Sequence, residues 1–91
     1  MPRVSPVNPE TRIAQREELE RQLAEGTISL GQAIKQMRQK WAGITQKRMA
    51  QLAGISVTTL SGIERDSGNA TVDTIQRVLR VLGASLTIRL H

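Results

Sequence analysis

The sequence predicts an all-α protein, in which a compact bundle of short helices follows an N-terminal helical extension and precedes one short C-terminal β-strand. Apolar residues recur at helical spacing in four stretches between residues 30 and 82, and each stretch follows a serine or threonine that can cap a helix. Gly26, Gly54 and Gly83 offer places for helices to end. Near the C-terminus the apolar period changes to two, which is typical of a strand.

The composition argues against an enzyme. The chain has 91 residues, no cysteine and one histidine, His91. It therefore lacks the residues for disulfides, for thiolate or histidine metal sites and for a nucleophile-histidine pair, so we expect no catalytic residue, metal or cofactor. A core this small is stabilised most simply by self-association. Residues 1–8 are polar and hold no apolar run suited to a signal peptide or membrane span, which predicts a cytoplasmic protein.

The net charge of +5 is unevenly distributed along the chain. Residues 1–26 carry four bases and five acids, whereas residues 27–91 carry nine bases and three acids. Residues 35–48 hold five cations and no acid. Such one-sided charge is expected of a surface that meets phosphates, although solvated helix faces would produce the same pattern.

The first helix is predicted over residues 9–25. Asn8 supplies a cap, Pro9 needs no amide hydrogen at the first helical position, and Gly26 ends the helix. Glu17 and Arg21 have the spacing of a favourable ion pair. The apolar stripe is weak, so we expect this helix to lie on the surface or against a partner. The stripe consists of Ile13, Leu19 and Leu23.

The second helix opens with a capping box formed by Ser29 and Gln32. One face of it is apolar, with Leu30, Ala33, Ile34, Met37 and Trp41 in helical register. Trp41 is the only aromatic residue, and we expect it to anchor the core or its edge, because base-stacking platforms normally use several aromatic residues.

Three further helices are predicted. One is capped by Thr45 and ends at Gly54, the next runs from Ser56 to residue 64 or 65, and the last is capped by Thr71 and stopped by Gly83. A turn over residues 66–69 separates the last two.

The final residues alternate as a half-buried strand does, with Leu86, Ile88 and Leu90 on one face. A lone strand leaves its backbone groups unpaired, and the same strand of a second copy is the simplest partner. A frayed tail that happens to alternate is the other interpretation. We therefore divide the chain into an N-terminal segment (1–26), a helical domain (27–84) and a dimerisation strand (85–91).

The stretch from residue 45 to residue 65 has the pattern of two short helices around a tight turn. Ala50 is small enough for a close helix crossing, Gly54 can take the positive φ of the turn, and Leu60 and Ile63 point inward. With Thr45-Gln46, Ile63-Glu64 and Gly68, this pattern resembles the Xre/Cro-type helix-turn-helix family, over roughly residues 30 to 83. The resemblance implies a lambda-repressor-like fold.

A domain of this type that ends in a strand looks like the HipB-like antitoxins, although the helix at 9–25 is not part of that pattern. The narrower resemblance implies a dimeric, sequence-specific repressor that binds a palindromic operator in double-stranded DNA, autoregulates its toxin-antitoxin operon and binds a HipA-like kinase toxin. A stand-alone phage-type repressor is one alternative. A partner-sequestering interaction protein, for which DNA binding is secondary, is the other.

Helical geometry selects the residues that could meet DNA. With Leu60 and Ile63 inward, the outward face of their helix is predicted to read bases through hydroxyl groups, thymine-methyl contacts and DNA shape. We expect Glu64 to bond a nearby cation or backbone amide, because a carboxylate facing DNA would repel it. The predicted base-reading residues are Ser56, Val57, Thr58, Ser61, Gly62 and Arg65. The predicted phosphate contacts are Thr45, Gln46, Lys47, Lys40, Arg48 and Arg38.

Overall fold

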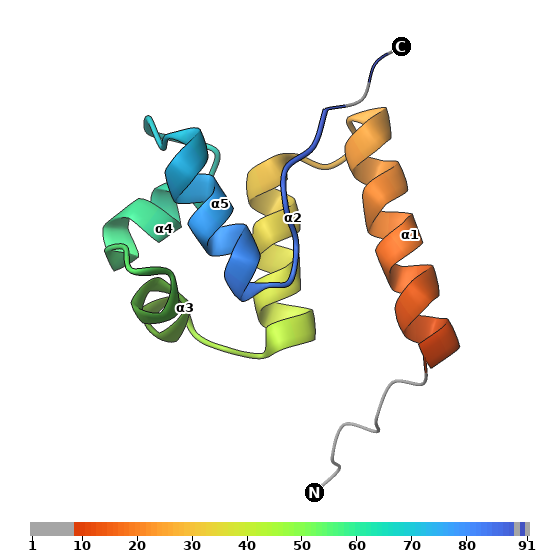
Figure 1. Ribbon diagram of the computed structural model, residues 1–91, viewed down its shortest axis with the longest axis horizontal. Coiled ribbons are helices and arrows are strands. Elements are labelled where there is room, and N and C mark those ends of the chain that lie inside the picture. Colours follow the sequence, from red (N-terminus) through yellow and green to blue (C-terminus); the bar gives the residue numbers. More distant parts are fainter. Residues whose placement is uncertain (1–8, 89, 91) are drawn as a thin grey trace, which may run out of the picture.

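The computed structural model describes residues 9–88 and 90, and the side chains among them from residue 11 onward. These residues form α1 (Pro9–Glu25), α2 (Leu30–Gln36), a π-helical turn η1 (Met37–Ala42), α3 (Gln46–Ala53), α4 (Val57–Glu64) and α5 (Val72–Val81). Figure 1 shows α2 to α5 as a bundle with α1 beside it. The predicted cap Asn8 and the terminal His91 lie outside the described residues.

Local capping chemistry determines where four of the helices begin, as predicted. Ser29 forms the complete capping box with Gln32 at the start of α2. The hydroxyls of Thr45, Ser56 and Thr71 each accept a hydrogen bond from the backbone amide three residues later. Each cap satisfies an amide that the helix leaves unpaired and contributes about 1 kcal/mol.

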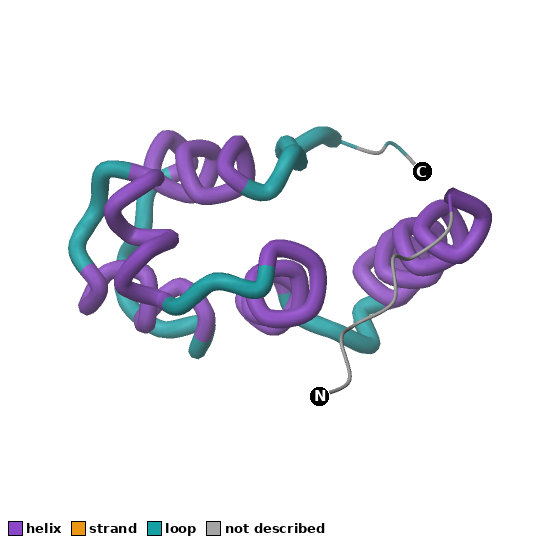
Figure 2. Tube along the Cα trace, turned by 90° about the horizontal axis from the view of Figure 1, so that it is seen from below, coloured by secondary structure: helices purple, strands orange, loops and turns teal. Residues whose placement is uncertain are grey.

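Helix α1 has the predicted bounds and lies at the edge of the bundle. Leu19 is its one buried side chain among residues 11–25, and it packs into the core from the α2 side. The predicted Glu17–Arg21 pair is wrong, because the guanidinium of Arg21 bonds Glu18 and Glu25 instead. Figure 2, which looks along the bundle from below, shows that α1 stands apart from α3, α4 and α5.

The core lies between α2, α3, α4 and α5. The largest of its fully buried side chains are Ile34, Met49, Leu60 and Val78, one from each of these helices. Trp41 is not among them, since 41% of its surface is exposed, and its prediction as a core or core-edge anchor is corrected. It lies in η1, where π-helical turns hold more residues than α-helical turns, so position 41 rotates away from the face that α2 buries.

The start of α2 packs closely on the end of α4. A Cβ atom added to Gly31 would lie 2.3 Å from the carbonyl oxygen of Ile63 and 2.6 Å from Oδ1 of Asp66. Asp66, with φ of 58°, accepts hydrogen bonds from the Gly31 amide and the Ser29 hydroxyl. Asp66 is therefore a second cap of α2, and not only a turn residue.

The predicted C-terminal strand does not form within the described chain. Residues 84–88 and 90 have no regular secondary structure, and Leu86, Ile88 and Leu90 are 36%, 85% and 90% exposed. A strand needs a neighbour for its backbone hydrogen bonds, and no described segment supplies one. Pairing with a second copy stays a prediction. Among the described residues, no helix is long and apolar enough to span a bilayer.

Candidate nucleic-acid interface

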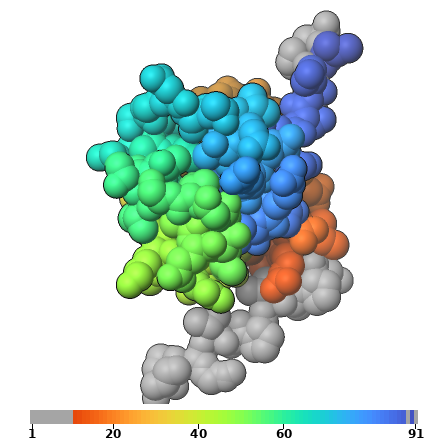
Figure 3. Space-filling model, turned by 60° about the vertical axis from the view of Figure 1, so that its left-hand side comes forward, coloured from red at the N-terminus to blue at the C-terminus, as the bar shows by residue number. Residues whose placement is uncertain are grey.

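Helices α3 and α4 form the predicted two-helix unit around a tight turn. Ala50 is 2% exposed at the crossing, and Gly54 ends α3 in the left-handed conformation with φ of 73°. Leu60 and Ile63 point into the core, as predicted. Figure 3 shows that the α3 and α4 segments lie side by side on one surface of the molecule.

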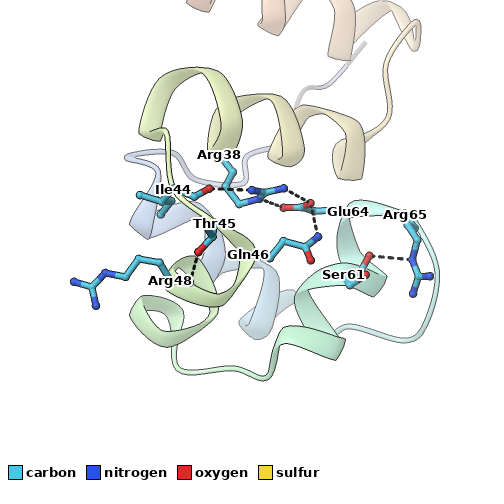
Figure 4. A network of polar contacts seen from close by, with 8 residues as sticks. All are labelled: Arg38, Ile44, Thr45, Gln46, Arg48, Ser61, Glu64 and Arg65. Atoms are coloured by element: carbon cyan, nitrogen blue, oxygen red, sulfur yellow. Dashed lines mark hydrogen bonds and ion pairs between the residues drawn. The ribbon is translucent and has the colours of Figure 1, made fainter. Parts of the chain in front are cut away.

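A buried polar network joins the ends of η1, α3 and α4 (Figure 4). The guanidinium of Arg38 donates to both carboxylate oxygens of Glu64, at 2.6 and 3.1 Å, and to the Ile44 carbonyl oxygen at 2.9 Å. The Gln46 side-chain amide donates to the same carboxylate at 2.9 Å. Arg38 and Glu64 are only 7% and 5% exposed. The network fixes the start of α3 relative to the end of α4.

The electrostatics of the network keep Glu64 ionised. Burial raises the pKa of the Glu64 carboxyl, but the hydrogen bonds from Arg38 and Gln46 and the charge of Arg38 outweigh burial and hold that pKa below its ordinary value. This arrangement fits the structural role expected of Glu64. It also corrects the prediction that Arg38 contacts phosphate, because its donors are buried and already engaged.

The other predicted phosphate contacts lie on the surface, with Gln46 half-buried. Lys40, Lys47 and Arg48 are exposed, and Thr45 and Gln46 stand at the start of α3. The Thr45 hydroxyl accepts from the Arg48 amide, and the Gln46 side chain is held by Glu64. The backbone amide of Gln46 is also available to a phosphate, near the positive end of the helix dipole.

The predicted base-reading residues lie along α4 and at its two ends, where Ser56 is the N-terminal cap and is exposed. Thr58 and Arg65 are exposed, Val57 is 41% exposed, and Ser61 and Gly62 are half-buried. The Nε of Arg65 donates to the Ser61 carbonyl oxygen. A Cβ on Gly62 would lie 3.4 Å from the Ser67 carbonyl oxygen, so Gly62 faces the turn after α4 and not a neighbouring helix.

Comparison with known proteins decides the family. Residues 34–88 match HTH_3, a helix-turn-helix family. The chain belongs to this helix-turn-helix family. Over 60 residues, or 66% of the chain, it is 33% identical to the HTH-type transcriptional regulator PuuR of Escherichia coli K12, and equally to the regulator of that name from Shigella flexneri. The match covers 32% of these proteins, so the chain spans about a third of the length of the curated relatives it matches. No solved structure is significantly similar.

The comparisons bear out the Xre-type helix-turn-helix resemblance, whereas the closer likeness to HipB-like antitoxins stays a prediction. The sequence interpretation missed two structural roles, the bond from Gln46 to Glu64 and the capping of α2 by Asp66. The sequence does single out Glu64, because it is the only acid between residues 26 and 65. A carboxylate surrounded in sequence by cations is expected to pair with one of them.

Proposed function

We propose that this protein is a DNA-binding transcription regulator, which inserts α4 into the major groove of a double-stranded operator and represses transcription as a homodimer. Membership of the helix-turn-helix family and the likeness to transcriptional regulators support the DNA-binding part. In this motif the second helix enters the groove while the first helix crosses the backbone.

The observation that best supports the proposal is that the one acid of α3 and α4 is buried, so it does not contribute negative charge to their surface. The only acid between residues 26 and 65 is Glu64, and it is buried and paired with Arg38. Apart from Arg38, all other charged side chains in that stretch are exposed cations, so α3 and α4 themselves contribute no exposed acid to this surface. These cations are Lys35, Lys40, Lys47, Arg48 and Arg65.

Phosphate contacts set the position of such a protein on DNA, and base contacts determine the sequence it prefers. We assign phosphate contacts to Lys40, Lys47, Arg48 and the backbone amides at the start of α3. We assign base contacts to the outward side of α4. The dimer is supported by the exposed apolar side chains of the tail, Leu86, Ile88 and Leu90, which lack cover in the single chain. A two-fold dimer calls for a palindromic operator.

Titration of a labelled duplex tests this function. The duplex comes from the DNA upstream of the protein's own gene, and binding is followed by fluorescence anisotropy at several salt concentrations. We expect the affinity to fall steeply with salt, because each phosphate contact adds roughly 0.9 to the slope of log K against log salt. Lys47→Ala lowers the slope by about 1. Arg16→Ala removes a charge from the exposed face of α1 and leaves the slope unchanged. Absence of binding to any duplex at low salt would contradict the proposal.

The antitoxin role, with a HipA-like kinase as the protein partner, is the narrower form of this proposal. It rests on the sequence resemblance. Co-expression with the product of the neighbouring gene tests it, since an antitoxin forms a stable complex with its toxin. A regulator that binds DNA and purifies alone under these conditions would be a stand-alone repressor.

A further inference from the structure

The hydroxyl groups at the start of α4 are engaged with each other. The Ser56 Oγ accepts a hydrogen bond from the Thr59 amide at 3.0 Å and donates one to the Thr59 Oγ1 at 2.9 Å. The bond from the Thr59 amide is the helix cap, which contributes about 1 kcal/mol. The hydroxyl proton of Ser56 is already donated to Thr59, so Ser56 is poorly suited to donating a hydrogen bond to a base.

The two residues between them present methyl groups instead. Val57 is 41% exposed at the first position of α4, and Thr58 is exposed beside it. Both side chains are β-branched, so their χ1 angles are restricted and their methyl groups are held in place before any ligand arrives. No hydrogen bond fixes the Thr58 hydroxyl within the described part of the chain. The exposed part of the Val57 side chain offers apolar surface that a methyl group of a ligand can cover, and covering it is favourable.

We infer that Val57 and Thr58 recognise the C5-methyl group of a pyrimidine base in the major groove, so that thymine methyls determine the preferred sequence. This inference rests on the proposed function, because it needs α4 in the groove. In the major groove a methyl group distinguishes thymine from every other unmodified base. Elsewhere on the α4 face, Gly62 has no side chain, and the side chains of Ser61 and Arg65 end in polar groups that suit the hydrogen-bonding edge of a base and not its methyl group.

Removing the methyl group from DNA tests the inference. A high-affinity duplex is selected from a random pool, and each thymine is then replaced in turn by deoxyuridine, which keeps every hydrogen-bonding group. Burial of one methyl group corresponds to about a four-fold change in affinity, so we expect roughly a four-fold loss at one or two positions of each half-site. A cytosine placed at such a position should bind more tightly when it carries a 5-methyl group.

Three variants connect the effect to these side chains. Thr58→Val keeps the methyl group and removes the hydroxyl, and Thr58→Ser does the reverse. We expect Thr58→Val to retain the preference for thymine over deoxyuridine, whereas Thr58→Ser and Val57→Ala reduce it. Lys47→Ala serves as the control, since it weakens binding to both duplexes equally. Circular dichroism of each variant verifies that the fold is intact.

The outcomes separate the inference from the function on which it rests. If the selected duplex binds in a salt-dependent manner but no thymine responds to replacement, the methyl reading is overturned and the proposed function stands. A preference that survives in Thr58→Ser and disappears in Thr58→Val would assign recognition to the hydroxyl, and would also overturn the inference. If no duplex binds, both proposals fall together.

Discussion

Replacement of Arg38 by methionine removes the cation of the buried network while keeping an apolar side chain of similar length. The guanidinium makes two hydrogen bonds to Glu64 and one to the Ile44 carbonyl oxygen. Without it, the Glu64 carboxylate retains only the Gln46 amide as a side-chain partner, and that carboxylate side chain is 2% exposed. Breaking a buried pair in this way costs about 3 to 5 kcal/mol.

This loss is large against the whole free energy of unfolding of a small domain, which is about 5 to 15 kcal/mol. Urea titration followed by far-UV circular dichroism measures it, and with m values of about 1 to 3 kcal/mol per molar the midpoint should fall by at least about 1 M. Lys40→Met removes an exposed cation two residues away and should change the stability by less than about 0.5 kcal/mol.

The double variant Arg38→Met/Glu64→Leu distinguishes the cost of an unpaired buried charge from the cost of changing the packing at this site. Because it leaves no buried charge, it should regain most of the stability that Arg38→Met loses. A cost for Arg38→Met below about 1 kcal/mol, the value of a surface pair, would refute the interpretation of this network as a buried ion pair. A double variant as unstable as the single one would refute it as well.

The same network predicts how stability depends on pH. The pKa of Glu64 is lower in the folded chain than its ordinary value of 4.5, so its ionised form stabilises the fold above that pH. The contribution is lost as the pH falls through the lowered pKa. The stability advantage of the wild type over Glu64→Gln should therefore be constant near neutral pH and shrink below about 4.5. An advantage that grew on acidification would contradict the assigned direction.

Three other variants test separate parts of the structure. Gly31→Ala should lower the free energy of unfolding by at least about 2 kcal/mol in urea titration, since its Cβ would lie 2.3 Å from the Ile63 carbonyl oxygen. A neutral effect would contradict the close packing of α2 on α4. Thr58→Ala should relax the sequence preference with little loss of nonspecific binding, whereas Lys47→Ala should weaken binding to all duplexes alike. Competition assays measure both effects, and the reverse pattern would mean that the roles of the two residues are exchanged. Deletion of residues 86–91 should shift the monomer-dimer equilibrium toward monomer in analytical ultracentrifugation, and an unchanged equilibrium would reject pairing through the tail.

The sequence predicted well what nearby residues determine. The bounds of α1 and the caps Thr45, Ser56 and Thr71 follow from hydrogen bonds that span three or four residues, so composition and spacing suffice to find them. The spacing of inward residues in α3 and α4 similarly predicted which sides face the core. These local signals were enough to locate the candidate interface.

The errors concern interactions that local spacing does not determine. Arg38 and Glu64 are 26 positions apart. Counting charges along the sequence could not show that Arg38 forms a buried ion pair with Glu64. Trp41 was predicted to anchor the core because the sequence pattern did not indicate the π-helical turn η1. Arg21 has several acids within reach on α1, and spacing could not choose among them. The predicted strand is not formed by residues 84–88 and 90 of the single chain, and its pairing with a second copy stays a prediction.

The start of α3 and the outward side of α4 are the proposed surface for duplex DNA. Chemical-shift mapping tests it most directly, by adding an unlabelled operator duplex to the isotope-labelled full chain. We expect the largest amide shifts in residues 45–48 and 56–65, with little change in α1. Shifts concentrated in α1, or no shifts on adding duplex at low salt, would contradict it.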